Sequence, residues 1–233
     1  MDGFLIALDY FFVREGRIDV VIYTASFIVL AVGLGGIFRR TWPEALAFGF
    51  LLLAGASALA LFVSRSLGIP AVLFGPLVAL VGGGTAILLR RVIFDGERLG
   101  PAFSSMHLLA SVIMAGSIWF AQILTPEPSA GLMANQPWYP IYVDKSFAVG
   151  RFLLPEDLSY YPGVLSSLYF NVDLIGLVAL GGWLNLGDTY AAYLAANIVA
   201  GIMCVTLLAW ALRDNAIVLA GFVLFFLVYF YVD

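Results

Sequence analysis

The most regular feature of the chain is a series of long apolar runs separated by polar stretches. Seven runs have the length of a membrane-spanning helix, and they cover residues 19–38, 44–63, 70–89, 104–124, 163–184, 189–212 and 215–231. About 20 apolar residues wound as a helix cross the hydrocarbon core of a bilayer with every backbone hydrogen bond satisfied. The pattern therefore predicts an all-α fold, a polytopic bundle of about seven transmembrane helices.

Composition supports a membrane protein and argues against several other classes. Hydrophobic residues make up 63% of the chain and charged residues only 11%, whereas a soluble domain usually has about 25% charged residues. The net charge of -4 and the lack of a basic patch argue against nucleic acid as a partner. The single cysteine, Cys204, and the single histidine, His107, argue against a disulfide scaffold, haem and multi-histidine metal centres. No flavin or nucleotide motif is present.

Paired arginines predict the orientation of the chain. Arg39–Arg40 and Arg90–Arg91 fall in alternate short loops, and arginines in short loops favour the cytoplasmic side. The turn at Arg65 and the long segment 125–162 then lie outside. We expect a multi-pass protein of the plasma membrane whose loop 125–162 is extracytoplasmic. Five further basic residues fall on the outer side in this arrangement, against the general bias: Arg14, Arg17, Lys145, Arg151 and Arg213.

Segment 125–162 is far longer than the usual two to eight residues between helices, and it is rich in aromatic residues that argue against disorder. Its prolines, from Pro126 to Pro140, predict an extended first half. Residues Lys145–Leu154 have the spacing of a short amphipathic helix, with Asp144 as its N-cap. We expect this helix to lie along the outer membrane face.

Three stretches in this region carry a resemblance to a known family. They read Pro-Ile-Tyr-Val-Asp-Lys over 140–145, Ala-Val-Gly-Arg-Phe-Leu over 148–153 and Tyr-Tyr-Pro-Gly over 160–163. With the spans around them, residues 104–233 resemble the first-loop region of GT-C-type glycosyltransferases. Those polytopic enzymes use sugars carried on polyprenyl phosphates, so the resemblance implies a sugar transferase acting at the outer membrane face.

The resemblance also implies roles for individual residues. Asp144 matches the acid that serves as general base for the acceptor hydroxyl, or helps to hold a divalent cation where one is used. Such a base must come within about 3 Å of the attacking oxygen, and the leaving phosphate needs a cation nearby. Lys145 and Arg151 are candidates for that positive charge, and Tyr160 and Tyr161 for further contacts with the substrate. Glu156 and Asp157 offer additional carboxylates in the same loop.

Each of these residues also has a structural interpretation that the sequence leaves open. Asp144 has the position of a helix cap. Lys145 and Arg151 are placed to bind anionic lipid headgroups. Tyr160 and Tyr161 fit the aromatic belt found at membrane interfaces.

The chain departs from the family pattern in its layout. Three spans in residues 1–103 precede the first-loop span, and the turn reads Tyr-Tyr-Pro-Gly where the family has a double proline. We therefore divide the sequence into an N-terminal part of three spans, 1–103, and a first-loop part of four spans, 104–233. Family enzymes continue with further spans, so the resemblance implies either a transferase or a truncated or split half of one.

Asp173 supports an alternative from another class. It falls near the middle of the expected span 163–184, where an ionisable side chain is costly and marks a functional candidate. The alternative is a non-catalytic membrane protein, either a transporter or an accessory subunit whose partners are lipids and further membrane subunits. The glycines near 33–36 and 82–84 favour close helix packing. Asp188 is expected to cap the helix that begins near Thr189.

Overall fold

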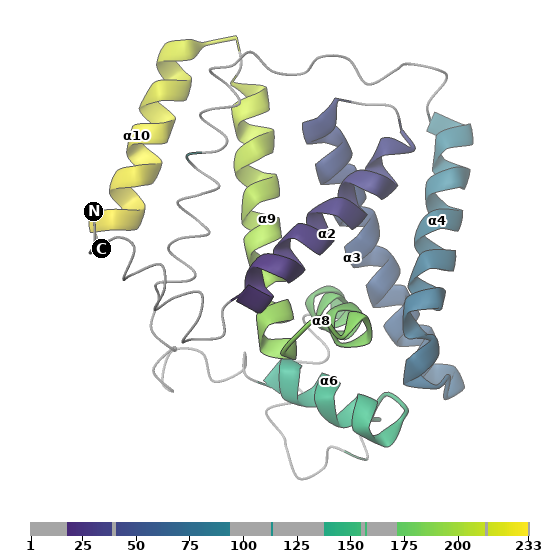
Figure 1. The fold of residues 1–233 in the computed structure, drawn as a ribbon. Coiled ribbons are helices and arrows are strands. Elements are labelled where there is room, and N and C mark those ends of the chain that lie inside the picture. Colours follow the sequence, from purple (N-terminus) through teal and green to yellow (C-terminus); the bar gives the residue numbers. More distant parts are fainter. Residues whose placement is uncertain are drawn as a thin grey trace. The chain divides into compact units, whose positions relative to one another are not determined.

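The computed structural model describes residues 18–38, 41–93, 113, 138–154, 157, 172–212 and 214–232, and these residues are helical apart from short turns (Figure 1). Its helices are α2 (Ile18–Gly36), α3 (Trp42–Leu67), η2 (Ala71–Leu73), α4 (Phe74–Ile93), α6 (Trp138–Val149), α8 (Val172–Leu184), α9 (Thr189–Ala211) and α10 (Ala216–Val232). The all-α class predicted from the sequence is confirmed.

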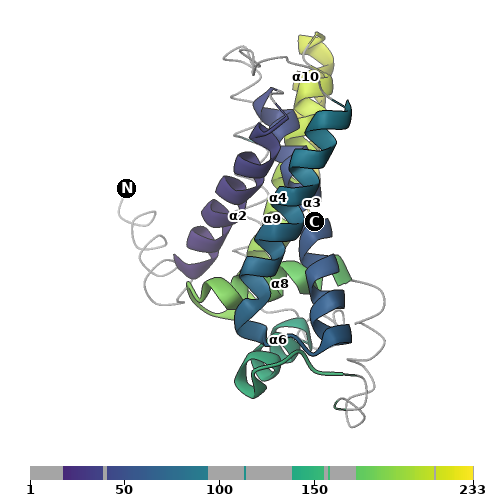
Figure 2. The same ribbon diagram turned by 90° about the vertical axis from the view of Figure 1, so that its right-hand side faces the viewer.

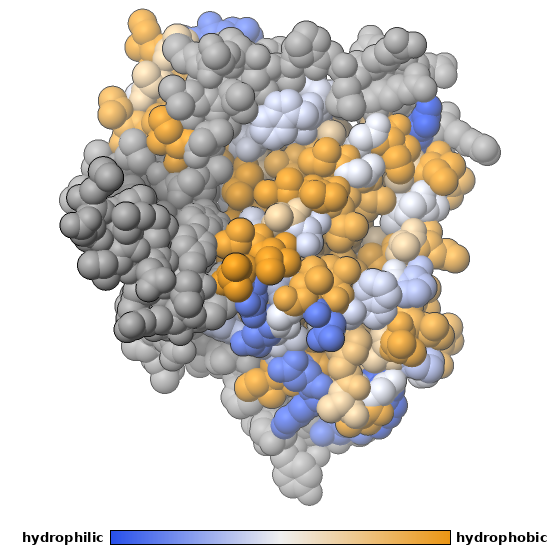
Figure 3. All heavy atoms as spheres, viewed as in Figure 1, coloured by the Kyte–Doolittle hydropathy of each residue, from blue (hydrophilic) through white to orange (hydrophobic). Residues whose placement is uncertain are grey.

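Four helices are long and apolar enough to cross a membrane. They cover Ile18–Gly36, Trp42–Leu67, Ala71–Arg90 and Thr189–Ala211, which confirms four of the expected spans. The expected span 215–231 corresponds to α10, and the expected span 104–124 lies outside the described residues except for Ile113. The exposed apolar side chains include Val29, Phe62 and Leu80. Apolar residues cover much of the described part of the face shown in Figure 3, as contact with lipid requires.

By their contacts, the helices form two compact units. Unit 1 comprises Met1–Phe27, Ala54–Val81 and Ser129–Ala196, so it holds α6, α8 and one end of each of α2, α3, α4 and α9. Unit 2 comprises Ile28–Leu53, Gly82–Pro128 and Asn197–Asp233. The division expected near residue 103 lies outside the described residues and stays a prediction.

Small residues let α2 and α3 pack closely in unit 2. A Cβ added at Gly35 would overlap the Ala45 backbone, and one at Gly49 would overlap Ala31, so α2 and α3 touch backbone to backbone. The glycines expected to pack closely near 82–84 do not make such contacts, because a Cβ at Gly83 or Gly84 would meet open space. In the same unit, α9 and α10 bury Val205, Ala209 and Leu219 in a cluster.

Helix α6 begins seven residues earlier than the sequence predicts. It covers Trp138–Val149, so Asp144 lies inside the helix and is not its N-cap. Pro140 was expected in extended chain, but it lies in the first turn, where its missing N–H removes no helical hydrogen bond. The helix ends at Val149 and is followed by Gly150, whose φ of 81° is a left-handed conformation that favours glycine. Arg151 and Phe152, which were expected in the helix, follow it in extended chain.

Helix α8 differs most from its expected role as a span. Figures 1 and 2 show that it runs across the first turns of α4 and α9, not alongside them, and that α6 packs crosswise beneath it. Residues 175–181 are all buried, so α8 is a core helix of unit 1.

Glycines allow α8 to pack this tightly. A Cβ at Gly176 would come within 2.6 Å of the Ser57 backbone in α3. One at Gly181 would overlap Ala192 in α9, and one at Gly182 would lie 2.9 Å from Val143 in α6. Three neighbouring helices therefore approach α8 through its glycines.

Candidate functional site

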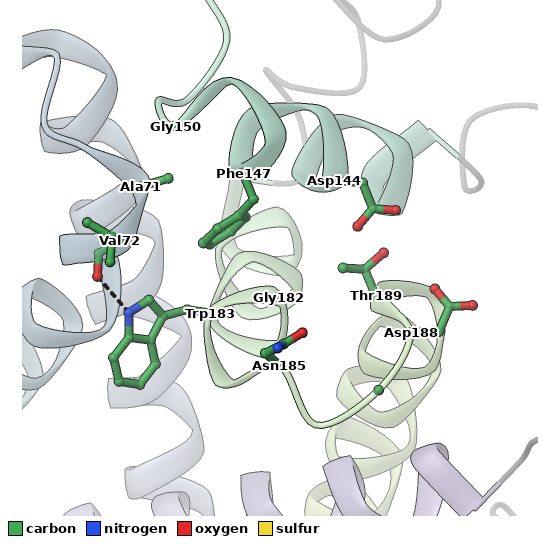
Figure 4. Close-up of a pocket in the computed structure, with 11 residues that line it drawn as sticks. Ala71, Val72, Asp144, Phe147, Gly150, Gly182, Trp183, Asn185, Asp188 and Thr189 are labelled. Carbon is green, nitrogen blue, oxygen red and sulfur yellow. Dashed lines mark hydrogen bonds between the residues drawn. The ribbon is translucent and has the colours of Figure 1, made fainter.

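A pocket of about 540 Å³ lies in unit 1 where α6, η2 and the turn between α8 and α9 meet (Figure 4). Its walls come from three separate parts of the sequence, and none of its lining side chains is basic. The lining residues are Ala71, Val72, Asp144, Phe147, Gly150, Gly182, Trp183, Asn185, Gly187, Asp188 and Thr189.

The two aromatic side chains stand on one side of the pocket in Figure 4. Trp183 donates its indole N–H to the Val72 carbonyl oxygen at 2.8 Å, which fixes the ring. Its ring lies against Gly75, where any Cβ would overlap it. Phe147 packs edge-on against Phe152, with ring centroids 5.9 Å apart. The pocket therefore has a preformed aromatic wall.

The turn between α8 and α9 is held by Tyr23 of α2. The Tyr23 hydroxyl lies 3.1 Å from the carbonyl oxygens of Gly181 and Gly187 and accepts the Leu186 N–H at 3.1 Å. Asn185 ends α8 with a φ of 50°, a conformation that asparagine tolerates. This anchoring fixes the floor of the pocket.

Two carboxylates organise the start of α9. Asp188 accepts the Tyr190 N–H at 3.0 Å, which confirms the predicted cap. Asp19, at the start of α2, accepts the Asp188 N–H at 3.2 Å. Both N–H groups are thus satisfied by carboxylates of the protein.

Asp144 and Thr189 point toward one another across the polar side of the pocket (Figure 4). Asp144 is exposed, whereas Thr189 keeps only 7% of its surface exposed. The buried Thr189 Oγ1 has no hydrogen-bond partner in the described part of the chain. A buried hydroxyl without a hydrogen-bond partner destabilises the fold unless a ligand or a water molecule supplies that partner.

Helix α6 is fastened to the segment that follows it, which fixes Asp144. Tyr142 donates its hydroxyl to the Leu153 carbonyl oxygen at 3.1 Å, and Ser146 Oγ accepts the Leu153 N–H at 3.2 Å. Burial raises the pKa of Tyr142 to about 12, so this hydroxyl keeps its proton. Beyond it, the Gly150 carbonyl oxygen accepts the Ala71 N–H at 2.9 Å and ties the segment to η2.

Arg151 forms an ion pair with Asp157. Its two terminal nitrogens lie 2.7 and 3.0 Å from the two carboxylate oxygens. The hydrogen bond from Arg151, together with the Leu154 N–H, lowers the pKa of Asp157 to about 2. The charge of Arg151 is therefore largely offset, which weakens its candidacy for binding a phosphate.

The remaining predicted residues divide into two groups. Lys145 is exposed on α6 beside Asp144 but does not line the pocket. Asp173 is exposed in the first turn of α8, away from the middle of any described span. Tyr160, Tyr161, Glu156 and His107 lie outside the described residues.

Sequence reasoning missed Trp183, Asn185 and Thr189 as pocket residues. They line the pocket together with Asp144 because α8 packs crosswise, whereas a membrane-spanning 163–184 places them on the opposite side of the bilayer from Asp144. Gly181-Gly182-Trp183 followed by Asn185 was the available signal, since small residues next to a helix-ending asparagine are typical of a tight turn.

The pocket combines a carboxylate able to accept a proton, polar groups able to orient hydroxyls and aromatic faces able to cover apolar ring faces. No group of three or more histidine, cysteine or acidic residues arranged to hold a metal ion occurs within the part of the chain that the structure describes.

Comparisons with known proteins give no relative. No family model matches the chain, and neither a curated protein nor a solved structure is significantly similar to it. The assignment that follows from the helices is that of an integral membrane protein with a polar and aromatic pocket in unit 1.

Proposed function

We propose that this membrane protein is a glycosyltransferase, or the lipid-sugar-binding half of one, which moves a sugar from a polyprenyl-phosphate donor. The observation that carries the proposal is the position of Asp144. The acid singled out by the resemblance to GT-C enzymes lines a pocket together with an indole, a phenyl ring, an amide and a hydroxyl. This set of groups suits a sugar, which presents both hydroxyls and apolar C–H faces.

Asp144 is the general base in this proposal. The acceptor hydroxyl oxygen attacks the anomeric carbon of the donor, and its proton passes to the Asp144 carboxylate. The bond between the anomeric carbon and the phosphate oxygen breaks, and its electron pair leaves with the lipid phosphate. Asp144 takes part in none of the described ion pairs or hydrogen bonds, so its carboxylate is open to a substrate.

The lipid phosphate needs positive charge outside the pocket, since no lining side chain is basic. Lys145 supplies it in this proposal, because it follows Asp144 on the exposed side of α6. Arg151 is a poorer candidate, because a phosphate must compete there with Asp157.

The decisive experiment measures sugar transfer in native membranes with a labelled polyprenyl-phosphate sugar. We expect Asp144→Asn to lower transfer at least 100-fold, as expected when a general base is removed. Asp173→Asn is the matched control, because Asp173 lies outside the pocket and undergoes the same loss of charge. Transfer should stay close to that of the unchanged protein, and protein levels should be equal in all three membranes.

Two outcomes reject the proposal. If only Asp173→Asn damages function, a transporter is the better assignment. If native mass spectrometry of gently extracted protein finds a stoichiometric protein partner and ordinary phospholipid but no polyprenyl phosphate, the chain is an accessory subunit.

A further inference from the structure

The charged side chains that line the pocket are all negative. Asp144 and Asp188 line it, and Asp19 reaches the backbone of the same turn. Among the described residues, two basic groups directly follow lining residues in the sequence: Lys145, on the exposed side of α6, and Arg151, which is paired with Asp157. A phosphate or carboxylate entering the pocket would therefore meet like charge without a lining cation to offset it.

A neutral ligand can use the hydroxyl-binding and aromatic groups of this lining but leaves its carboxylate charge uncompensated. Any ligand that fills the pocket removes water from the carboxylates of Asp144 and Asp188, and a desolvated carboxylate is costly without a compensating charge. An ammonium group supplies that charge and donates three hydrogen bonds.

Thr189 gives a second, independent indication of a ligand. Its hydroxyl is buried, lacks a partner within the described residues and lies between the two pocket carboxylates in Figure 4. Three oxygen-bearing groups from α6 and from the start of α9 thus converge on one end of the pocket. Trp183 and Phe147 cover the other end, where a carbon skeleton would lie.

We propose that the pocket binds an amine-bearing acceptor alcohol. Its ammonium group lies between Asp188 and the Thr189 hydroxyl, its hydroxyl faces Asp144, and its carbon skeleton lies against Phe147 and Trp183. This inference rests on the proposed function for the role of the ligand as acceptor. The preference for an ammonium group rests on the pocket alone.

Binding of three sugars that share one ring tests the charge preference. The full chain, purified in lipid nanodiscs, is titrated with glucosamine, glucose and glucose 6-phosphate at a pH where the amine is protonated. We expect glucosamine to bind at least about tenfold more tightly than glucose, the difference expected for one charge-assisted hydrogen bond. Glucose 6-phosphate should bind more weakly than glucose.

Variants locate the effect in the pocket. Asp188→Asn should abolish the preference for glucosamine while keeping the cap of α9, because asparagine caps a helix as well as aspartate does. Thr189→Val should weaken glucosamine binding, and Thr189→Ser should restore it. Asp214→Asn removes a carboxylate from unit 2 and should leave binding unchanged.

Equal affinity for glucosamine and glucose, or tighter binding of glucose 6-phosphate, overturns the inference. So does a glucosamine preference that survives Asp188→Asn. The transfer assay separates this failure from failure of the proposed function. If sugar transfer depends on Asp144 but the pocket shows no amine preference, the proposed function stands and the acceptor is neutral. If the pocket prefers amines but no transfer occurs, the proposed function fails and the chain is an amine-binding membrane protein.

Discussion

The Thr189 hydroxyl makes the free protein less stable than it could be. Its oxygen is buried without a described partner, and an unsatisfied buried hydroxyl costs about 1–3 kcal/mol. Valine has nearly the same shape, so Thr189→Val should raise the free energy of unfolding by about 1 kcal/mol or more. Denaturant unfolding in detergent, followed for the ligand-free protein, measures the change. A loss of stability would mean that the hydroxyl already has a partner.

The pair formed by Arg151 and Asp157 predicts a titration at unusually low pH. The hydrogen bond from Arg151 lowers the pKa of Asp157 from the model-peptide value of 3.8 to about 2. A lowered carboxyl pKa stabilises the fold fully above pH 3.8, and this contribution is lost as the pH falls through about 2. An NMR titration of the Asp157 carboxyl carbon should therefore have its midpoint near pH 2.

Arg151→Gln should return that midpoint toward 3.8, because the first cause of the shift is removed. Lys145→Gln is the control, since it removes a basic residue that contributes none of the causes of the Asp157 shift. A midpoint near 3.8 in the unchanged protein would mean that the ion pair does not form in solution.

At the scale of helices, the packing of α8 depends on Gly176. A Cβ there would lie 2.6 Å from the backbone of Ser57, which cannot move aside as a flexible side chain could. Gly176→Ala should therefore lower the free energy of unfolding by about 1–3 kcal/mol, the usual cost of overpacking a core. Gly55→Ala in α3 is the matched control, because its Cβ meets open space. Thermal unfolding of both variants measures the difference, and equal effects would contradict the close contact.

The helices also show which features the sequence could predict. Hydropathy is a local property, so the runs at 19–38, 44–63, 70–89 and 189–212 could be identified as spans without knowledge of their neighbours. The sequence predicts too late a start for α6, because Pro140 favours extended chain by itself, although the first turn of a helix accepts proline. Asp144 is expected at the N-cap of a helix that starts at Lys145, whereas it lies inside α6 and lines the pocket.

The position of α8 could not be predicted from its own sequence. Val172–Leu184 is as apolar as a membrane span, and only its burial by α3, α6 and α9 separates a core helix from a span. The pocket depends on this packing, since it brings Asp188 and Thr189 to the end of unit 1 that holds Asp144. The local sequence pattern singled out Asp144 on one wall of the pocket, and long-range packing brings the other walls to it.

For the molecule as a whole, the crosswise α8 changes the path of the chain through the membrane. If 163–184 crossed the bilayer, α6 and the start of α9 would lie on opposite sides. In the structure both line one pocket, so α9 starts on the side of α6. The 23 residues of α9 measure about 35 Å, enough to carry the chain to the other side.

Labelling with a membrane-impermeant thiol reagent tests this path. In a Cys204→Ser background, which removes the single native cysteine, new cysteines replace exposed residues: Ala148→Cys on α6, Leu186→Cys in the turn before α9 and Asp214→Cys after α9. We expect the first two to react from the same side of intact cells or vesicles and the third from the opposite side. The Leu186→Cys variant decides the result. If its cysteine reacts from the side of the membrane opposite to that of Ala148→Cys, then 163–184 is a membrane span. Asp144 and the turn that holds Asp188 would then be separated by the thickness of the bilayer.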